Sequence, residues 1–312
     1  MRVIFMGTPD FAVPTLQAVI DAGHEVAAVF TQPDKAKGRG KAVVYTPVKE
    51  KALEYHIPVY QPVKVRDPEV IEQIRQMNPD VIVVVAFGQL LPKTLLDIPP
   101  YGCINVHASL LPKYRGAAPI QWAVINGEKI SGVTTMYMAE GLDTGDMILK
   151  EEVMLDEKET GGSLHDKLSV IGAALLVKTL NMLKEGTAVR EKQDDSLKGQ
   201  YAKMLDKHMG AIDFNEPAEK IERLIRGLNP WPSAYTKLNG KTCKFWLADV
   251  DSSDYDGVCG EVVRVTKNDF VIKTGQGGLI VKELQLEGKK RMDAGAFMRG
   301  VSIKEGVIFG ES

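Results

Sequence analysis

Hydrophobic residues in the first 188 positions alternate between short continuous runs and helix-spaced stripes. The run Val81–Ala86 contains no polar residue, which is typical of a strand that a parallel sheet buries on both faces. Stretches with apolar positions three and four apart stand between such runs and predict helices. This alternation predicts an α/β Rossmann-like domain with a mostly parallel sheet and helices on both faces. The expected strands are Val3–Met6, Val26–Thr31, Val81–Ala86, Gly102–His107, Val133–Met138 and Met147–Val153, and the expected helices are Val13–Ala22, Pro68–Met77 and Ser163–Lys184.

The pattern changes after residue 188. The longest expected helix has Ser163 as its predicted N-cap and Gly186 just past its end. Residues 189–207 are charged with little periodic apolar pattern, which predicts a linker. Regularly spaced short strands then favour a small OB-like β-barrel. We therefore expect a catalytic domain at 1–188, a linker at 189–207 and an OB-like domain at 208–312. Its expected elements are a helix at Pro217–Leu228 and strands at Thr242–Ala248, Gly260–Val265, Phe270–Lys273 and Leu279–Leu286.

Length and composition agree with two ordinary globular domains. The chain has 312 residues, of which 44% are hydrophobic and 26% charged. Its net charge of -2 means that any contact with nucleic acid must come from local clusters of cations. Three cysteines without a Cys-x-x-Cys spacing suit a reducing cytoplasm. No apolar run is long enough to span a membrane, and the chain opens directly on a strand pattern that leaves no room for a signal peptide.

Asn105 and His107 stand two residues apart on the expected strand Gly102–His107. Alternate residues of a strand share a face, so the amide and the imidazole can converge on one substrate atom. A neutral donor beside a titratable ring suits a carbonyl whose oxygen gains negative charge, with the ring moving a proton. Asp143, in the glycine-punctuated stretch Glu140–Asp146, would orient the ring and stabilise its charge. The alternative is a buried hydrogen-bonded pair and a surface turn.

The string from Asn105 to Pro119 resembles the formyltetrahydrofolate-dependent formyltransferases, and within that family the members that act on methionyl-tRNA. The Asn-x-His and distant Asp of the family match Asn105, His107 and Asp143, and its Ser-Leu-Leu-Pro segment begins at Ser109. The resemblance implies a transfer of the formyl group of 10-formyltetrahydrofolate to the α-amino group of methionyl-initiator tRNA. The product would be N-formylmethionyl-tRNA for translation initiation, made in the cytoplasm by an enzyme that we expect to be a monomer.

A folate pocket is expected where the strand Val81–Ala86 ends, because open α/β sheets bind ligands at the carboxyl ends of their strands. Apolar walls with backbone donors and acceptors suit a planar pterin. With the segments that the family resemblance adds, the expected folate-binding residues are Phe87, Gly88, Gln89, Leu90, Leu91, Pro92, Ser109, Leu110, Leu111, Pro112, Gly141 and Leu142.

Neither NAD nor a metal is expected as a cofactor. The first strand ends in Gly7-Thr-Pro-Asp, which lacks the G-x-G-x-x-G of dinucleotide sites and carries a proline without a backbone donor. Four other histidines stand apart without ligand spacing, namely His24, His56, His165 and His208.

Two cationic segments are candidates for contact with tRNA. Residues 31–51 hold six Lys or Arg against two Asp or Glu, a local charge of +4 in an acidic chain. Such a segment is often only a solvated loop, yet lysines and arginines supply phosphate contacts. It resembles the insertion that tRNA formyltransferases use on the acceptor arm. The second domain is neutral overall, with one dense cationic spot. The expected tRNA-binding residues are Lys35, Lys37, Arg39, Lys41, Lys289, Lys290 and Arg291.

Three other functions share parts of these motifs. A glycinamide ribonucleotide formyltransferase would normally end near the close of the first domain and carry a glycine-rich phosphate loop at Gly7–Asp10. A sugar-nucleotide formyltransferase can carry a second small domain but needs no cationic arm at Lys35–Lys41. A module that binds folate or RNA without chemistry would not need Asn105, His107 and Asp143 together.

Overall fold

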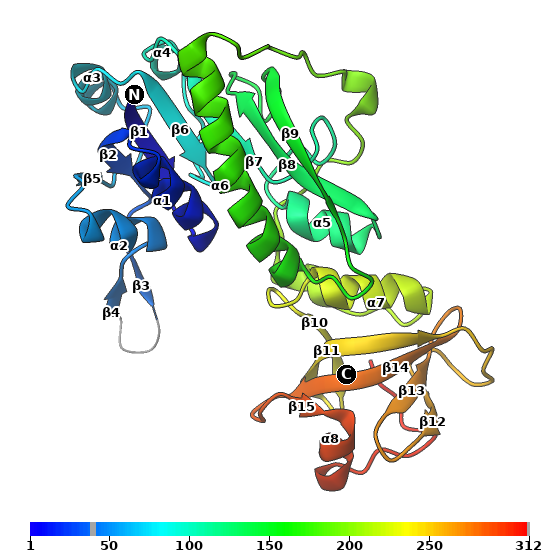
Figure 1. Ribbon diagram of the computed structural model, residues 1–312. Coiled ribbons are helices and arrows are strands. Elements are labelled where there is room, and N and C mark those ends of the chain that lie inside the picture. Colours follow the sequence, from blue (N-terminus) through cyan, green and yellow to red (C-terminus); the bar gives the residue numbers. More distant parts are fainter. Residues whose placement is uncertain (38–41, 311–312) are drawn as a thin grey trace. The chain divides into compact units, whose positions relative to one another are not determined.

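The computed structural model describes residues 1–37 and 42–310 of the chain (Figure 1). They form two compact units, each of which we describe by itself. The first contains residues 1–119, 130–154 and 165–202, and the second contains 120–129, 155–164 and the chain from 203 onward. In the described part, no helix is long and apolar enough to cross a membrane.

The first unit is built on a seven-stranded sheet of order β5-β2-β1-β6-β7-β8-β9. The five strands from β5 to β7 pair in parallel, whereas β8 and β9 are antiparallel to their neighbours. The sheet is therefore mostly parallel, as the sequence predicts. The strands are β1 (Arg2–Gly7), β2 (Glu25–Phe30), β5 (Val59–Tyr60), β6 (Val81–Val85), β7 (Cys103–His107), β8 (Ile130–Tyr137) and β9 (Met147–Met154), and the helices of this part of the chain are α1 (Val13–Asp21), α2 (Pro47–Glu54), α3 (Pro68–Gln76), α4 (Lys93–Leu96), α5 (Pro119–Ile125) and α6 (Gly161–Glu185).

Helices cover both faces of this sheet, and their positions show on which face of β7 the candidate catalytic side chains lie. The long helix α6 lies along one face (Figure 1), where its Gly172 packs against Val106 of β7. On the other face Ile71 and Ile74 of α3 belong to the same hydrophobic core as Ile82 of β6. Asn105 and His107 alternate with Val106 along the strand, so they face away from α6.

The second unit is an antiparallel sheet of order β10-β11-β14-β13-β12, with β15 paired to β14. Among the described residues no pairing joins β10 to β12, so the expected closed OB-like barrel is not confirmed. The core of this unit includes Ile221 and Ile225 from α7 and Phe245 from β11. Its elements are α7 (Ala218–Gly227), β10 (Ala234–Leu238), β11 (Lys241–Asp251), β12 (Val262–Val265), β13 (Phe270–Lys273), β14 (Gly278–Leu286), β15 (Met292–Asp293) and α8 (Ala294–Gly300).

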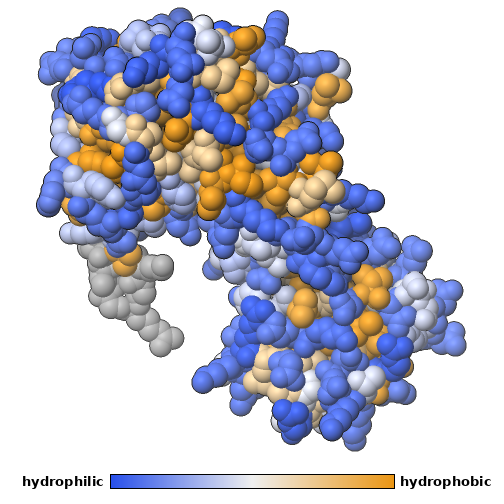
Figure 2. Space-filling model, in the orientation of Figure 1, coloured by the Kyte–Doolittle hydropathy of each residue, from blue (hydrophilic) through white to orange (hydrophobic). Residues whose placement is uncertain are grey.

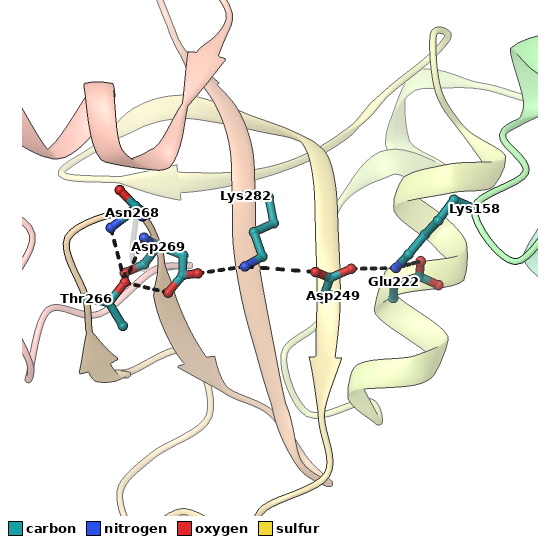
Figure 3. A network of polar contacts seen from close by, with 7 residues as sticks. All are labelled: Lys158, Glu222, Asp249, Thr266, Asn268, Asp269 and Lys282. Carbon is teal, nitrogen blue, oxygen red and sulfur yellow. Dashed lines mark hydrogen bonds and ion pairs between the residues drawn. The ribbon is translucent and has the colours of Figure 1, made fainter.

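A row of alternating charges crosses the second unit (Figure 3). Lys158 Nζ lies 2.5 Å from Asp249 and 3.7 Å from Glu222. Lys282 Nζ lies 4.0 Å from Asp249 and 2.6 Å from Asp269. The row connects the short segment 155–164 to α7, β11 and β14. Its members range from the exposed Lys158 to the buried Glu222, and together they hold the segment against these elements.

The expected elements are observed to within a few residues, but the structure adds several that were not expected, among them α2, α5, β10 and α8. The prediction of Ser163 as N-cap is wrong, because α6 begins at Gly161. Thr160 caps it instead: the Ser163 N–H donates to Thr160 Oγ1 (3.0 Å), and the Thr160 N–H donates to Ser163 Oγ (2.9 Å). The strand β10 was not expected, because it is short and directly follows the prolines of Asn229–Pro232.

The surface of the first unit is not uniformly polar. Figure 2 shows hydrophobic residues gathered over the middle of this unit, whereas the visible face of the second unit is mostly hydrophilic. Leu90 and Leu142, two of the expected folate-binding residues, are large hydrophobic side chains that remain 69% and 45% exposed. Exposed apolar side chains beside polar groups are typical of ligand-binding surfaces.

Candidate active site

The last strand of the parallel part of the sheet, β7, carries the amide and the imidazole expected for catalysis. Asn105 pairs in register with Met136 of β8, and His107 pairs with Thr134, so both side chains project to the same face. Asn105 is half-buried. Among the described residues its side-chain amide has no hydrogen-bond partner, which leaves the amide available to a ligand.

His107 is held by its Nε2 atom. The ring is buried, and Nε2 donates to the carbonyl oxygen of Tyr114 at 3.0 Å. A carbonyl oxygen only accepts, so the hydrogen of the neutral ring is on Nε2 and the lone pair is on Nδ1. Nδ1 lies 3.8 Å from Asp143 Oδ2, close enough for charge interaction but too far for a hydrogen bond. Nδ1 is therefore the nitrogen that remains for a proton transfer.

Asp143 lies on a loop that starts at the opposite end of β7 from His107. The loop that carries it follows β8, an antiparallel strand, and starts beside the far end of β7, where the Met138 N–H donates to the Cys103 carbonyl (2.8 Å). The Asp143 backbone has a φ of +52°, in the left-handed region that residues other than glycine adopt infrequently. Its Oδ2 accepts from the Gly116 N–H at 2.9 Å. The structure thus places Asp143 beside His107, on the strand whose same face carries Asn105.

Further polar residues surround this group that the sequence did not indicate. Arg115, next to Gly116, donates from Nε to the side chain of Gln193 at 2.9 Å. Gln193 lies in the expected linker, 50 residues after Asp143, and is only 7% exposed. No local pattern marks it, because its environment is made by segments distant in the sequence.

The expected folate segment after β6 has both buried and open parts. Phe87 and Leu91 are packed in the core, whereas Gly88 and Leu90 are exposed. The Gln89 side chain is occupied, since its Oε1 accepts from the Val65 N–H (2.7 Å) and its Nε2 donates to the Pro62 carbonyl (3.2 Å). These two bonds fix the Gln89 amide group in place beside the exposed Gly88 and Leu90.

The expected folate segment after β7 is mostly buried. Ser109 is buried and donates to the Lys113 carbonyl at 2.7 Å, and Leu111 is in a small core with Met136 and Met147. Leu110 is half-buried, and Pro112 is buried after a cis peptide bond. Gly141 and Leu142 lie in the exposed part of the loop that carries Asp143.

The expected tRNA-binding residues lie in two places. Lys35 is exposed in β3 (Lys35–Lys37), whose Lys37 pairs with Ala42 of β4 (Ala42–Val44). Arg39 and Lys41 lie outside the described residues. Lys289, Lys290 and Arg291 are exposed in the turn between β14 and β15. Arg291 pairs with Glu283, and its guanidinium lies 4.8 Å from the centre of the Trp246 ring.

The cysteine at the start of β7 is not a candidate nucleophile. Burial raises the pKa of the Cys103 thiol to about 12, so the thiolate is not available near neutral pH. Among residues 1–37 and 42–310, no group of three or more His, Cys, Asp or Glu side chains is placed to hold a metal ion.

Solved structures share this fold at low identity. A sugar 3N-formyl transferase, WlaRD, solved with dTDP and 5-N-formyl-THF, superposes with a TM-score of 0.68 at 19% identity, over 93% of this chain and 99% of that one. HypX from Aquifex aeolicus in complex with tetrahydrofolic acid gives a TM-score of 0.64 at 16% identity, over 100% of this chain and 51% of that one. At such identities the similarity shows the fold alone.

Sequence comparison is far more specific. Residues 1–180 match the Formyl transferase family, and residues 204–302 match the Formyl transferase, C-terminal domain. The methionyl-tRNA formyltransferase of Agathobacter rectalis is 61% identical over 99% of both chains. That of Lachnospira eligens is 60% identical over the full length of both. Identity of this extent, across both matched domains, means that the chain belongs to the formyl transferase family, among the methionyl-tRNA formyltransferases.

Proposed function

We propose that this protein transfers the formyl group of 10-formyltetrahydrofolate to the α-amino group of methionine esterified to initiator tRNA. The observation that carries this proposal is that Asn105 and His107 share one face of β7 while the Asp143 carboxylate lies 3.8 Å from His107 Nδ1. A hydrogen-bond donor, a basic nitrogen and an anion in one place are what the attack of an amine on a formyl carbon requires.

In the proposed reaction the amine nitrogen forms a bond to the formyl carbon, whose oxygen becomes negative in a tetrahedral intermediate. The free Asn105 amide donates to that oxygen. The proton lost by the amine moves to His107 Nδ1, where Asp143 stabilises the resulting imidazolium. The proton then passes to N10 of the folate as the carbon–nitrogen bond to the formyl group breaks.

This chemistry does not need a strong base. A free α-amino group has a pKa of about 7.7–8.0, and an ester neighbour lowers it, so much of the nucleophile is already neutral. The main contributions of the protein are then the position of the amine and the stabilisation of the oxyanion. The Tyr114 carbonyl fixes the orientation of the His107 ring, which keeps Nδ1 where it can accept the proton of the amine.

We propose two contact regions for tRNA. The first is the cationic segment from Lys35 to Lys41, and the second is the exposed turn Lys289–Arg291. The surroundings of the second support the proposal, since the Trp246 ring has Arg291 at 4.8 Å and Lys244 at 5.6 Å. Cations around an aromatic ring suit the phosphates and bases of RNA.

The remaining parts of the proposal follow from this partner. We assign catalysis to 1–188, a linker to 189–207, and tRNA binding to an OB-like domain at 208–312. We also propose that the protein acts as a monomer in the cytoplasm, where tRNA is aminoacylated and used in translation.

One assay tests the choice of acceptor. Labelled 10-formyltetrahydrofolate is offered with methionyl-tRNA, glycinamide ribonucleotide or an amino sugar nucleotide at equal concentration. We expect the label in the tRNA fraction alone. Preferential label in either small acceptor would overturn the proposal, and the absence of label from all three would favour a binding module.

A further inference from the structure

The linker after α6 is mostly exposed, but Gln193 and Ala202 are buried at two points where it contacts the segments around the catalytic centre. Glu191 and Met147 exchange two backbone hydrogen bonds (2.8 and 2.9 Å). Ala202 accepts from the Ala117 N–H at 2.8 Å and donates to the Arg115 carbonyl at 2.9 Å. Before Gln193 the linker contacts Met147, at the end of the Asp143 loop. After Gln193 it contacts the segment Arg115–Ala117, whose Gly116 binds the Asp143 carboxylate.

Gln193 uses its whole amide group at this place. Its Nε2 donates to the carbonyl oxygens of Asp143 and Gly145, each at 2.8 Å. Its Oε1 accepts from Arg115 Nε at 2.9 Å. A side chain that is only 7% exposed and satisfied at both ends is fixed in one orientation. The two carbonyls that it holds belong to the loop that presents the catalytic carboxylate.

The Asp143 loop needs such a hold. Asp143 has a positive φ of +52°, a conformation that is less favourable than the extended or right-handed one and that surrounding contacts stabilise. Its side chain has one backbone donor, the Gly116 N–H, and Gly116 is the residue that follows Arg115. Gln193 thus holds the Asp143 carboxylate from two sides. It binds the backbone of Asp143 directly, and through Arg115 it holds the segment whose Gly116 N–H donates to the carboxylate.

We propose that Gln193 is a positioning residue for formyl transfer, acting through Asp143. It holds the backbone that sets the distance between Asp143 Oδ2 and His107 Nδ1, now 3.8 Å. The inference rests on the proposed function, because this distance matters only if Asp143 serves the reaction. Displacement of a catalytic group by about 1 Å can lower a rate by about 100-fold, so a fixed loop is worth keeping.

The test uses Gln193→Leu and Gln193→Glu in the full-length protein, with Lys192→Ala as the matched control. Lys192 is the exposed neighbour in the same linker. Leu removes all three hydrogen bonds at similar size. Glu keeps the acceptor for Arg115 but loses the donors to the Asp143 and Gly145 carbonyls. We expect kcat to fall at least about 10-fold in both variants, with KM for folate and for tRNA within about threefold of wild type.

Two results would overturn the proposal. Wild-type kcat in Gln193→Glu, which decides the matter even if Gln193→Leu fails to fold, would show that the donors to the loop are unimportant. A rise in KM with unchanged kcat would show a substrate-binding role instead.

A double-mutant cycle separates positioning from general damage to the fold. If Gln193 works through Asp143, adding Gln193→Leu to Asp143→Asn lowers kcat little further. Losses that multiply would mean that Gln193 acts independently, contrary to the proposal. The cycle also tells the two proposals apart. Full activity in Asp143→Asn alone contradicts the proposed function, whereas an impaired Asp143→Asn with a normal Gln193→Glu contradicts only the role of Gln193.

Discussion

Replacing Asp143 by Asn removes one negative charge and almost nothing else. The amide is nearly the same size as the carboxylate, and its oxygen can still accept from the Gly116 N–H. The charge lies 3.8 Å from His107 Nδ1, with side chains that are 13% and 7% exposed. At an effective dielectric constant of about 20, unit charges at this distance interact by about 4 kcal/mol. Since 1.36 kcal/mol corresponds to a factor of ten in rate, the imidazolium loses up to about three powers of ten in stabilisation.

We therefore expect Asp143→Asn to lower single-turnover formyl transfer to methionyl-tRNA by about 100- to 1,000-fold, while folate binding and melting temperature stay close to wild type. Asp146→Asn is the control, because Asp146 is three residues later in the same loop and pairs with Arg190 at 3.9 Å rather than with His107. A transfer rate within about fivefold of wild type in Asp143→Asn, or an equal loss in Asp146→Asn, would refute the electrostatic argument.

Three further predictions follow from the site, the charges and the fold. Asn105→Ala and His107→Ala should each lower turnover at least about 100-fold in a folded protein, because one oxyanion donor typically contributes 10²–10³; near-normal turnover would remove the residue from the catalytic group. Arg39→Ala should weaken use of methionyl-tRNA and lower the slope of log affinity against log salt by about one unit, with folate binding unchanged; equal slopes would remove Arg39 from the interface. Hydrogen bonds from Ser253 and Tyr255 hold the pKa of Asp251 below its usual range, so the stability it contributes is present above about pH 4 and is lost as the pH falls through the lowered value. Asp251→Asn should flatten the fall in melting temperature between about pH 5 and pH 2, and an unchanged profile would contradict that origin.

The sequence predicted the parts of the site that depend on local geometry. Asn105 and His107 share a face because they are two apart on a strand, and this relation needs no knowledge of tertiary structure. The family resemblance supplied the distant Asp143. Neither source gave the route of its loop, which starts beside Cys103 at one end of β7 and returns to His107 at the other end. Nor did they show that Nε2 of His107 is bound to Tyr114, which leaves Nδ1 for proton transfer.

Gln193 shows why the rest of the site could not be predicted. It lies between charged residues in a stretch without periodicity, so its composition indicates an exposed linker. Its burial comes from Arg115 and Asp143, which are 78 and 50 residues away. For the same reason the spacing of short strands predicted a second domain built of strands, but the OB-like barrel that it favoured is not confirmed, since closure depends on contacts between distant strands.

The fold by itself does not explain why tRNA rather than a sugar nucleotide would be formylated. A sugar formyl transferase superposes on 93% of this chain, so a second domain of this kind is compatible with a small acceptor. The difference must then lie in side chains that such an acceptor does not need. The +4 segment at 31–51 and the cations around Trp246 are two such groups. Lysines and arginines that pair with the phosphates of a large polyanion release its counterions, and a single sugar nucleotide has few phosphates to offer. We therefore propose that these cationic groups, rather than the reaction centre at β7, favour tRNA as the acceptor.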